Sequence, residues 1–386
     1  MKAEWTRKKL CEIAELNPKE FLPKGTVAKK VPMDKLRPFC REIPGFEMSA
    51  YSGGAKFRNG DTIMARITPC LENGKTAKVN ILSEGEVGFG STEYIVFRAK
   101  PGVADADFLY YLVCSPTVRE PAIQSMVGSS GRQRVQNGVL EQLEVLLPPL
   151  EVQRAIGAVL RALDDKIALN TRINDNLTQQ AQAIFKAWFV DFLPFGEARP
   201  AKWELSNIYK LSDIIYGAPF KSKLFNTKGD GIPIVRIRDL KSTVLNTYTT
   251  ELPPNGYLLR DGDIVVGMDG EFRPYIWANG SAWLNQRVCV FANKRPQGKF
   301  FLFFTIAPLL YEIEQTEQAT TVIHIGKQDF DRFEFYYPDE ESLNQFDSLT
   351  MPIYQAIVKN QEESIRLAEI RDALLPRLMS GELECE

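Results

Sequence analysis

The sequence predicts an α+β protein in which two globular domains are separated by two long antiparallel helices that pack like a coiled coil, giving a pseudo-twofold internal repeat. Two observations support this fold class. Residues 140–149 align with residues 330–339 at an offset of 190, and each is a short strand-like segment closed by proline. A heptad pattern of apolar residues then follows each segment. The 386 residues therefore represent one globule and one long helix, used twice.

The repeat extends upstream into the globules. Residues 59–66 match residues 261–268 at an offset of 202, and in both a Gly-Asp turn leads into an apolar strand. Between these segments and the proline-closed strands, residues 93–97 match residues 287–291 at an offset of 194. Because the offset shrinks along the chain, the differences in length lie inside the globules.

Each globule is expected to combine strands, Gly-, Asn- and Asp-rich turns, and a helix. The helix of the first globule runs from a cap at Asp105 to residue 112, and that of the second covers residues 300–310. The expected strands are residues 62–67, 76–82, 93–98, 263–268 and 287–292.

The first long helix is predicted to begin after Pro149 and to end before Leu193. Its length of about 40 residues corresponds to roughly 60 Å. A parallel arrangement of the two helices would need a connection of that length. Residues 191–338 could supply such a connection, so the antiparallel arrangement is favoured without being required.

The second long helix contains two prolines. Pro352 is expected to break off a short leading helix, because proline cannot donate the backbone hydrogen bond of a helix interior. Pro376 is expected to kink or end the main helix before Gly381.

The heptad seam is apolar except for a polar middle. Asn170 and Asn360 are equivalent by the repeat, and each either fixes the register of the two helices or lies exposed to solvent. The seam residues expected to join the helices are Leu160, Leu163, Ile167, Asn170, Leu177, Ile184, Trp188, Ile353, Ile357, Asn360, Leu367, Leu374 and Leu378.

The net charge of −2 conceals a gradient along the chain. Residues 1–150 carry 21 basic and 17 acidic groups, residues 151–190 carry 5 and 4, and residues 191–338 carry 17 of each. Residues 339–386 carry 4 basic and 11 acidic groups. The acidic tail is typical of a solvated helix face or a protein-binding surface, so it removes little from the DNA-binding potential of the rest.

The sequence lacks the residues that several classes of enzyme and metal-binding protein need. Neither a nucleotide-binding glycine motif nor a Cys/His cluster is present, and residues 252–255 have the wrong order for the motif of amino-methyltransferases. The single histidine, His324, has no neighbouring Cys or His, so we expect a packed or phosphate-contacting residue there rather than a catalyst. A zinc site and a disulfide framework are equally unsupported by the six cysteines, Cys11, Cys40, Cys70, Cys114, Cys289 and Cys385. Without a membrane-spanning run or a secretory signal, the chain is expected to be cytoplasmic.

Five motifs occur in order along the chain. They are GDTIMARITPCLENGK at 60–75, GSTEY at 90–94, LPPLEVQR at 147–154, FVDF at 189–192 and LLPRLMSGE at 374–382. In these motifs and their spacing, essentially the whole chain resembles the specificity subunits of type I restriction-modification systems. The second half departs from this pattern at residues 268–275, as expected of domains that read different bases.

The resemblance implies four segments: target-recognition domain 1 (1–150), a central spacer helix (151–192), target-recognition domain 2 (193–338) and a distal spacer helix (339–386). Each domain would read half of a split, asymmetric site in double-stranded DNA. The helix seam would dock two methyltransferase subunits, and restriction/translocase subunits would join later. The resemblance implies no catalysis, cofactor or metal in this chain, with S-adenosylmethionine, ATP and Mg²⁺ on the partner subunits, and no membrane.

Base edges are read mainly by Arg or Lys on guanine and by Asn or Gln on adenine, so candidates are such residues on turns. In the first domain the best cluster follows two small-residue turns at 128–131, although a solvated loop would look similar. The resemblance places residues 72–75 on a comparable loop, and Arg66 could equally be a salt-bridged strand residue. The first-domain candidates are Arg66, Glu72, Asn73, Lys75, Arg132, Gln133, Arg134, Gln136 and Asn137.

In the second domain Arg236 and Arg238 alternate with apolar residues, so they are expected to share one strand face. That face would suit phosphate contacts or a surface ion-pair ladder equally. The remaining candidates are Lys241, then Arg273 and Tyr275 in the divergent loop, and Lys327 and Gln328 after the histidine.

Two functions of other classes stay open. A coiled-coil scaffold that binds only protein would show no sequence-dependent binding to DNA. A carboxylate-based hydrolase, which would use Asp261 with Asp263 or Asp269 with Glu271, would turn over substrate alone. These carboxylates lie in turn-forming Gly-Asp contexts, which makes the hydrolase the weakest hypothesis.

Overall fold

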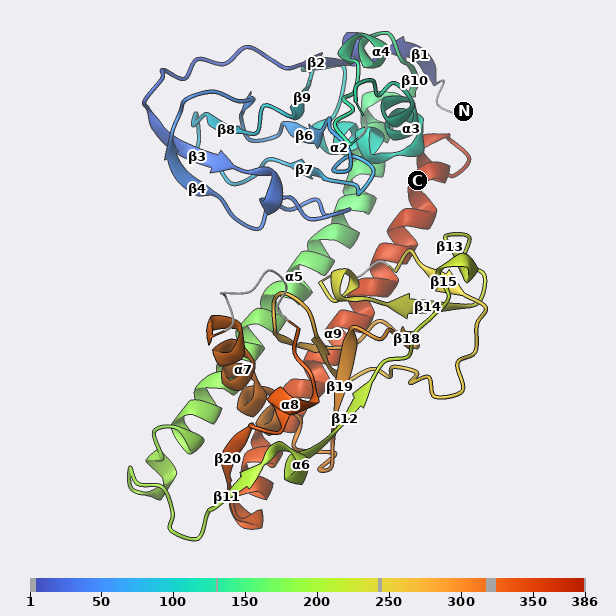
Figure 1. Ribbon diagram of the computed structural model, residues 1–386. Coiled ribbons are helices and arrows are strands. Elements are labelled where there is room, and N and C mark those ends of the chain that lie inside the picture. The colour runs from blue at the N-terminus through green and yellow to red at the C-terminus, as the bar shows by residue number, and fades with distance from the viewer. Residues whose placement is uncertain (1–4, 130, 242–244, 317–323, 385–386) are drawn as a thin grey trace. The chain divides into compact units, whose positions relative to one another are not determined.

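The computed structural model describes residues 5–129, 131–241, 245–316 and 324–384. The chain divides into two compact units. Unit 1 comprises Met1–Ala168 with Leu367–Glu386, and unit 2 comprises Leu169–Arg366. The long helices α5 (Leu150–Phe189) and α9 (Glu340–Met379) each contribute one segment to both units (Figure 1).

Unit 1 contains two four-stranded sheets, ordered β2-β9-β6-β7 and β4-β3-β8-β5, and a two-stranded sheet β1-β10, among the residues described. Its helices besides the long ones are α1 (Leu10–Ile13), α2 (Ala106–Cys114), α3 (Pro116–Gln124) and α4 (Asn137–Glu141). Its strands are β1 (Thr6–Lys9), β2 (Ala14–Leu16), β3 (Val27–Val31), β4 (Glu47–Ala50), β5 (Lys56–Phe57), β6 (Thr62–Ala65), β7 (Thr76–Lys78), β8 (Gly88–Gly90), β9 (Tyr94–Ala99) and β10 (Glu144–Leu147).

Unit 2 repeats this plan. Its first four-stranded sheet, β12-β19-β16-β17, has the same order of equivalent strands, and β11 pairs with β20 as β1 pairs with β10. Its strands are β11 (Glu204–Asn207), β12 (Ser212–Tyr216), β13 (Phe225–Asn226), β14 (Ile232–Val235), β15 (Tyr248–Thr249), β16 (Ile264–Gly267), β17 (Pro274–Ile276), β18 (Trp283–Leu284), β19 (Val288–Asn293) and β20 (Glu334–Tyr337). The helices that complete it are α6 (Ile208–Leu211), α7 (Lys299–Thr316) and α8 (Lys327–Phe330).

The second sheets of the two units differ at their edges. Both contain a parallel pair, β3 with β8 in unit 1 and β14 with β18 in unit 2. Beside β8 unit 1 adds β5, whereas unit 2 adds β13 beyond β15, at the opposite edge. The internal repeat is therefore confirmed in its topology, and the units diverge where strands are peripheral.

The predicted elements of the globules are largely confirmed. Strands β6, β7, β9, β16 and β19 lie where the sequence placed them, with ends that differ by a few residues. The Asp105 carboxylate caps α2 by accepting from the backbone N–H groups of Asp107 (2.9 Å) and Phe108 (3.0 Å). Helix α7 continues beyond the expected residue 310 to Thr316.

Helix α5 begins directly after Pro149 and ends at Phe189, as predicted, but the expected break at Pro352 is wrong. Helix α9 is continuous from Glu340 to Met379. Phe346 and Tyr354, on either side of the proline, are buried in the core of unit 2, and we infer that this packing outweighs the missing backbone hydrogen bond. The helix does end before Gly381, whose φ of +73° is suited to glycine.

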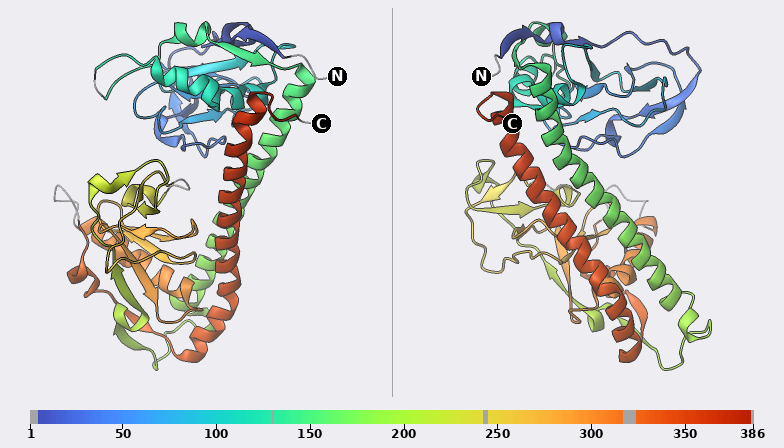
Figure 2. Two further views of the ribbon diagram at one scale, coloured as in Figure 1. Left: turned by 90° about the vertical axis from the view of Figure 1, so that its right-hand side faces the viewer. Right: turned by 180° about the vertical axis from the view of Figure 1, so that it is seen from behind.

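The long helices pair antiparallel within each unit. In unit 1 Ile156 and Leu160 share a core with Leu378, and Figure 2 shows the last turns of α9 beside the first turns of α5. In unit 2 the ring centroids of Phe185 on α5 and Phe346 on α9 lie 6.1 Å apart. Every predicted seam residue is buried or half-buried.

The polar middle of the seam is built from asparagines of unit 2. Asn170 is 1 % exposed and donates through Nδ2 to the backbone oxygen of Asn360 (3.3 Å). Asn360 donates to Oδ1 of Asn174 (2.8 Å), and Asn174 donates to the backbone oxygen of Ile357 (3.2 Å). Since a shift along the helix would leave buried amides without partners, these bonds favour the register role over solvent exposure for Asn170.

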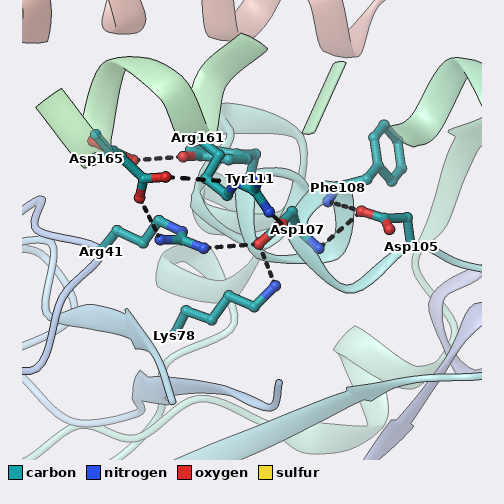
Figure 3. A network of polar contacts seen from close by, with 9 residues as sticks. Arg41, Lys78, Asp105, Asp107, Phe108, Tyr111, Arg161 and Asp165 are labelled. Carbon is teal, nitrogen blue, oxygen red and sulfur yellow. Dashed lines mark hydrogen bonds and ion pairs between the residues drawn. The ribbon is translucent and has the colours of Figure 1, made fainter. Parts of the chain in front are cut away.

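A cluster of charged side chains joins helix α2 to helix α5 in unit 1 (Figure 3). The Asp107 carboxylate accepts from Arg41 (2.9 Å) and Arg161 (3.2 Å), and it contacts the Lys78 ammonium. Arg41 also donates to Asp165 (3.2 Å). These five residues, here called the Asp107 cluster, fix the globule of unit 1 to its segment of the long helix.

Candidate nucleic-acid interface

Two sequence-distant candidate segments meet at the end of strand β6 in unit 1. The Arg66 N–H donates to the backbone oxygen of Glu93 (2.9 Å), and the Arg66 oxygen accepts from the N–H of Val135 (2.9 Å). The Thr68 N–H donates to the oxygen of Gln133 (3.0 Å). These backbone bonds bring the candidates at 66–75 and 132–137 side by side.

Most candidates of the first segment are engaged within the fold. Arg66 donates through Nη2 to the backbone oxygen of Val135 (3.0 Å), which replaces the salt bridge considered from the sequence. Glu72 accepts from the Thr68 hydroxyl (3.0 Å). Lys75 donates to the backbone oxygen of Met33 (2.9 Å), and Asn73 is exposed.

The second segment carries the most exposed basic groups of this surface. Arg132 is exposed, and Arg134 forms a bidentate ion pair with Glu93, with Nη2 and Oε1 2.6 Å apart. That hydrogen bond and the charge of Glu93 raise the pKa of Arg134. Ser130, within the predicted cluster, lies outside the described residues.

The other members of this segment differ in exposure. Gln136 is exposed and donates to the backbone oxygen of Ser125 (3.1 Å), whereas Gln133 is half-buried. Asn137 begins α4, and its buried Oδ1 has no hydrogen-bond partner among the described residues.

Unit 2 repeats these backbone hydrogen bonds at the end of strand β16, and the arrangement common to both units is here called the shared frame. The Met268 N–H donates to the oxygen of Arg287 (2.9 Å), and the Met268 oxygen accepts from the N–H of Ile325 (2.9 Å). Asp269 and His324 form a β-bridge, as Ile67 and Arg134 do in unit 1. Positions 66, 93 and 134 of unit 1 therefore correspond to positions 268, 287 and 324 of unit 2.

At this frame unit 2 holds three polar side chains. Asp269 Oδ1 lies 2.6 Å from His324 Nδ1 and 3.3 Å from Arg287 Nη1. Arg287 is not among the residues predicted from the sequence. The signal was available, because the alignment of residues 93–97 with 287–291 places Arg287 at the position of Glu93.

The expectation that Arg236 and Arg238 share a strand face is wrong. Arg236 follows β14, and Arg238 lies in the 3₁₀ turn Ile237–Asp239. The Asp239 carboxylate closes this turn by accepting from the backbone N–H of Arg236 (3.1 Å) and from its Nε (3.2 Å). This local hydrogen bonding competes with an extended strand and bends the chain. Arg238 is left exposed.

The remaining candidates of unit 2 are either engaged within the fold or exposed. Among the engaged ones, Lys241 pairs with Glu271, and Arg273 pairs with Glu314 (Nη2 to Oε1, 3.2 Å). Burial raises the pKa of Tyr275. In the second group, Lys327 and Gln328 are exposed on α8.

The carboxylates proposed for a hydrolase serve turns or ion pairs. Asp261 accepts from the N–H of Gly280 (2.9 Å), and Asp263 accepts from the N–H of Arg260 (2.9 Å). Among the residues described, no cluster of three or more His, Cys, Asp or Glu is arranged to hold a metal ion. No helix in the described part of the chain is long and apolar enough to cross a membrane.

Comparisons with known proteins agree with this architecture. Residues 2–179 and 200–364 match the family described as the type I restriction modification DNA specificity domain. The chain is 27 % identical to the MjaIX specificity subunit of Methanocaldococcus jannaschii, over 74 % of this chain and 71 % of that protein. It is 24 % identical to the HindI specificity subunit of Haemophilus influenzae, over 89 % of each. The crystal structure of the type I system S subunit from M. genitalium has a similar fold, with a TM-score of 0.51, 14 % identity, and coverage of 98 % and 96 %.

Proposed function

The chain belongs to the type I restriction modification DNA specificity family, and on this premise we propose that it reads one split, asymmetric sequence in double-stranded DNA. Each globule contacts one half of the site. Residues 1–150 and 193–338 act as the two target-recognition domains, and residues 151–192 and 339–386 act as spacer helices. The chain selects the DNA sequence and assembles the other subunits on it, and it performs no catalysis.

The observation that supports this proposal is the repeated frame at the ends of β6 and β16. Equivalent backbone hydrogen bonds hold different side chains in the two units. Arg134 pairs with Glu93 in one, whereas Arg287 meets Asp269 and His324 in the other. A common scaffold with different polar groups is suited to reading two different half-sites.

We propose that the paired helices dock two methyltransferase subunits, with restriction/translocase subunits joining the same assembly. S-adenosylmethionine, ATP and Mg²⁺ would bind to those subunits. The acidic segment 339–386 supports a protein-facing role for α9, because its charge would repel DNA phosphates.

Sequencing of DNA methylation in a host with and without the gene tests the proposal, provided that the methyltransferase is present in both. We expect a split methylated motif only when the gene is present, because the methyltransferase needs this chain to select its site. An unchanged methylation pattern would favour the protein-only scaffold. Turnover of a substrate by the isolated chain would favour the hydrolase.

The spacer helices are proposed to set the gap between the two half-sites. Four residues added to both α5 and α9, at matched seam positions, lengthen each helix by ~6 Å. At ~3.4 Å per base pair, the gap in the methylated motif is expected to grow by at most about two base pairs.

A matched control is a four-residue insertion in the exposed turn near Lys228, between β13 and β14. Methylation-site sequencing should then return the original gap. If the helix variants also methylate with the original gap, the helices do not set the spacing.

A further inference from the structure

The repeated frame holds one arginine in each unit against an acidic side chain. In unit 1 Arg134 occupies position 134 and its acid, Glu93, occupies position 93. In unit 2 the arginine occupies the position equivalent to 93, and Asp269 holds it from the neighbouring strand end. The arginine and its acid therefore occupy different positions in the two units, but each pair lies at the shared frame.

Both arginine side chains remain partly exposed to solvent. The side chain of Arg134 is 45 % exposed and that of Arg287 is 51 % exposed. Arg287 uses Nη1 for its contacts with Asp269 (3.3 Å) and His324 (3.2 Å). Within the described residues no partner is shown for its Nε or Nη2, so these N–H groups are available to an external acceptor.

An acid that restrains an exposed arginine lowers the entropy lost when the guanidinium binds. The two parallel N–H donors of a restrained guanidinium match the O6 and N7 acceptors of guanine in the major groove. Arg287 is therefore better prepared for base recognition than Arg238, whose side chain is 71 % exposed and whose Nε lies 3.8 Å from Asp239.

We propose that Arg287 reads a guanine in the half-site bound by the second recognition domain, as the counterpart of Arg134 in the first. This inference rests on the proposed function. Asp269 and His324 act as positioning residues, because they contact the arginine from the equivalents of positions 67 and 134. His324 Nδ1 can donate to Asp269 or accept from Arg287, but not both at once.

The test uses the chain assembled with its methyltransferase and records methylation frequency for every base at each motif position. Arg287→Lys retains the positive charge but loses the bidentate geometry. We expect the preference for guanine at one position of one half-site to fall by about 5- to 140-fold, with the other half-site unchanged. Arg134→Lys should affect a single position of the other half-site.

Asp269→Asn tests the positioning role. The preference at the Arg287 position should weaken by a smaller factor, while the melting temperature changes little. Loss of thermal stability with unchanged preference would assign Asp269 a purely structural role.

The control is Arg260→Lys, an exposed arginine at the opposite end of strand β16, about 13 Å of strand away. It should leave the motif unchanged. If Arg287→Lys lowers methylation uniformly across sequences, the arginine contacts phosphate and the inference is overturned. If Arg287→Lys leaves the motif intact, the inference also fails while the proposed function stands. If the unaltered chain produces no split motif, the proposed function itself fails.

Discussion

Replacing Asp107 with asparagine is expected to lower the free energy of opening of helix α2 by about 3 kcal/mol at pH 7. The carboxylate serves Arg41, Lys78 and Arg161 at once. The Arg41 and Lys78 side chains are only 10 % exposed, so a neutral partner leaves two cations in poorly solvated surroundings. Hydrogen exchange of the α2 amides should accelerate about 140-fold.

A matched control lies in the same cluster. The Asp165 side chain is 52 % exposed, so Asp165→Asn is expected to cost about 1 kcal/mol or less. Equal acceleration of exchange in the two variants would contradict the central role of Asp107.

The effect of Asp107 also depends on pH. Burial alone would raise the pKa of this carboxyl, but hydrogen bonds and charge from Lys78 and then Arg41 outweigh burial and hold it below its ordinary value of 3.8. A carboxylate with a lowered pKa contributes stability that is present above its unfolded pKa and lost as pH falls through the folded pKa. The difference between the native chain and Asp107→Asn should therefore shrink below pH 3.8.

The Asp107 cluster illustrates what sequence patterns can and cannot predict. Periodicity and proline placement predicted α5 to within a few residues, and the Asp105 cap is a local signal that fixed the start of α2. The pairing of Asp107 with Arg41 joins positions 66 residues apart, and no local pattern encodes such a contact. The helix break expected at Pro352 was wrong for the same reason, since the packing that keeps the helix continuous comes from other elements.

At the candidate interface, too, the sequence predicted the repeated elements but not the contacts between distant residues. The repeat correctly aligned residues 93–97 with 287–291, and the first position of each segment accepts an equivalent backbone hydrogen bond in the structure. Residue type alone could not separate Arg66, which bonds to a backbone oxygen inside the fold, from exposed Arg132. Arg236 and Arg238 were misplaced because Asp239 turns the chain where alternation suggested a strand.

The substitution Arg371→Met is expected to destabilise unit 1 by about 3–5 kcal/mol. Arg371 is 8 % exposed and donates from Nη1 to Asp164 Oδ1 (2.6 Å) and to the backbone oxygen of Phe39 (3.2 Å). The Tyr111 hydroxyl donates to the other oxygen of Asp164 (2.6 Å). Methionine fills similar space but leaves the Asp164 carboxylate buried with one neutral donor.

Calorimetry should show the melting temperature of unit 1 falling by roughly 10 °C. Arg377→Met is the matched control on the same helix. Its pair with Glu382 is exposed, at 49 % and 61 %, so the expected loss is below about 1 kcal/mol.

The double variant Asp164→Leu with Arg371→Met separates two explanations. If the single variant is unstable because an unpaired charge remains buried, removing that charge should restore most of the stability, since apolar replacements of buried ion pairs are often neutral. If the double variant is as unstable as the single one, the hydrogen bonds to Tyr111 and Phe39 matter more than the charge. The heptad position of Arg371 is equivalent to that of buried Ala181 on α5. The same position of the repeat is therefore apolar in unit 2, which favours recovery.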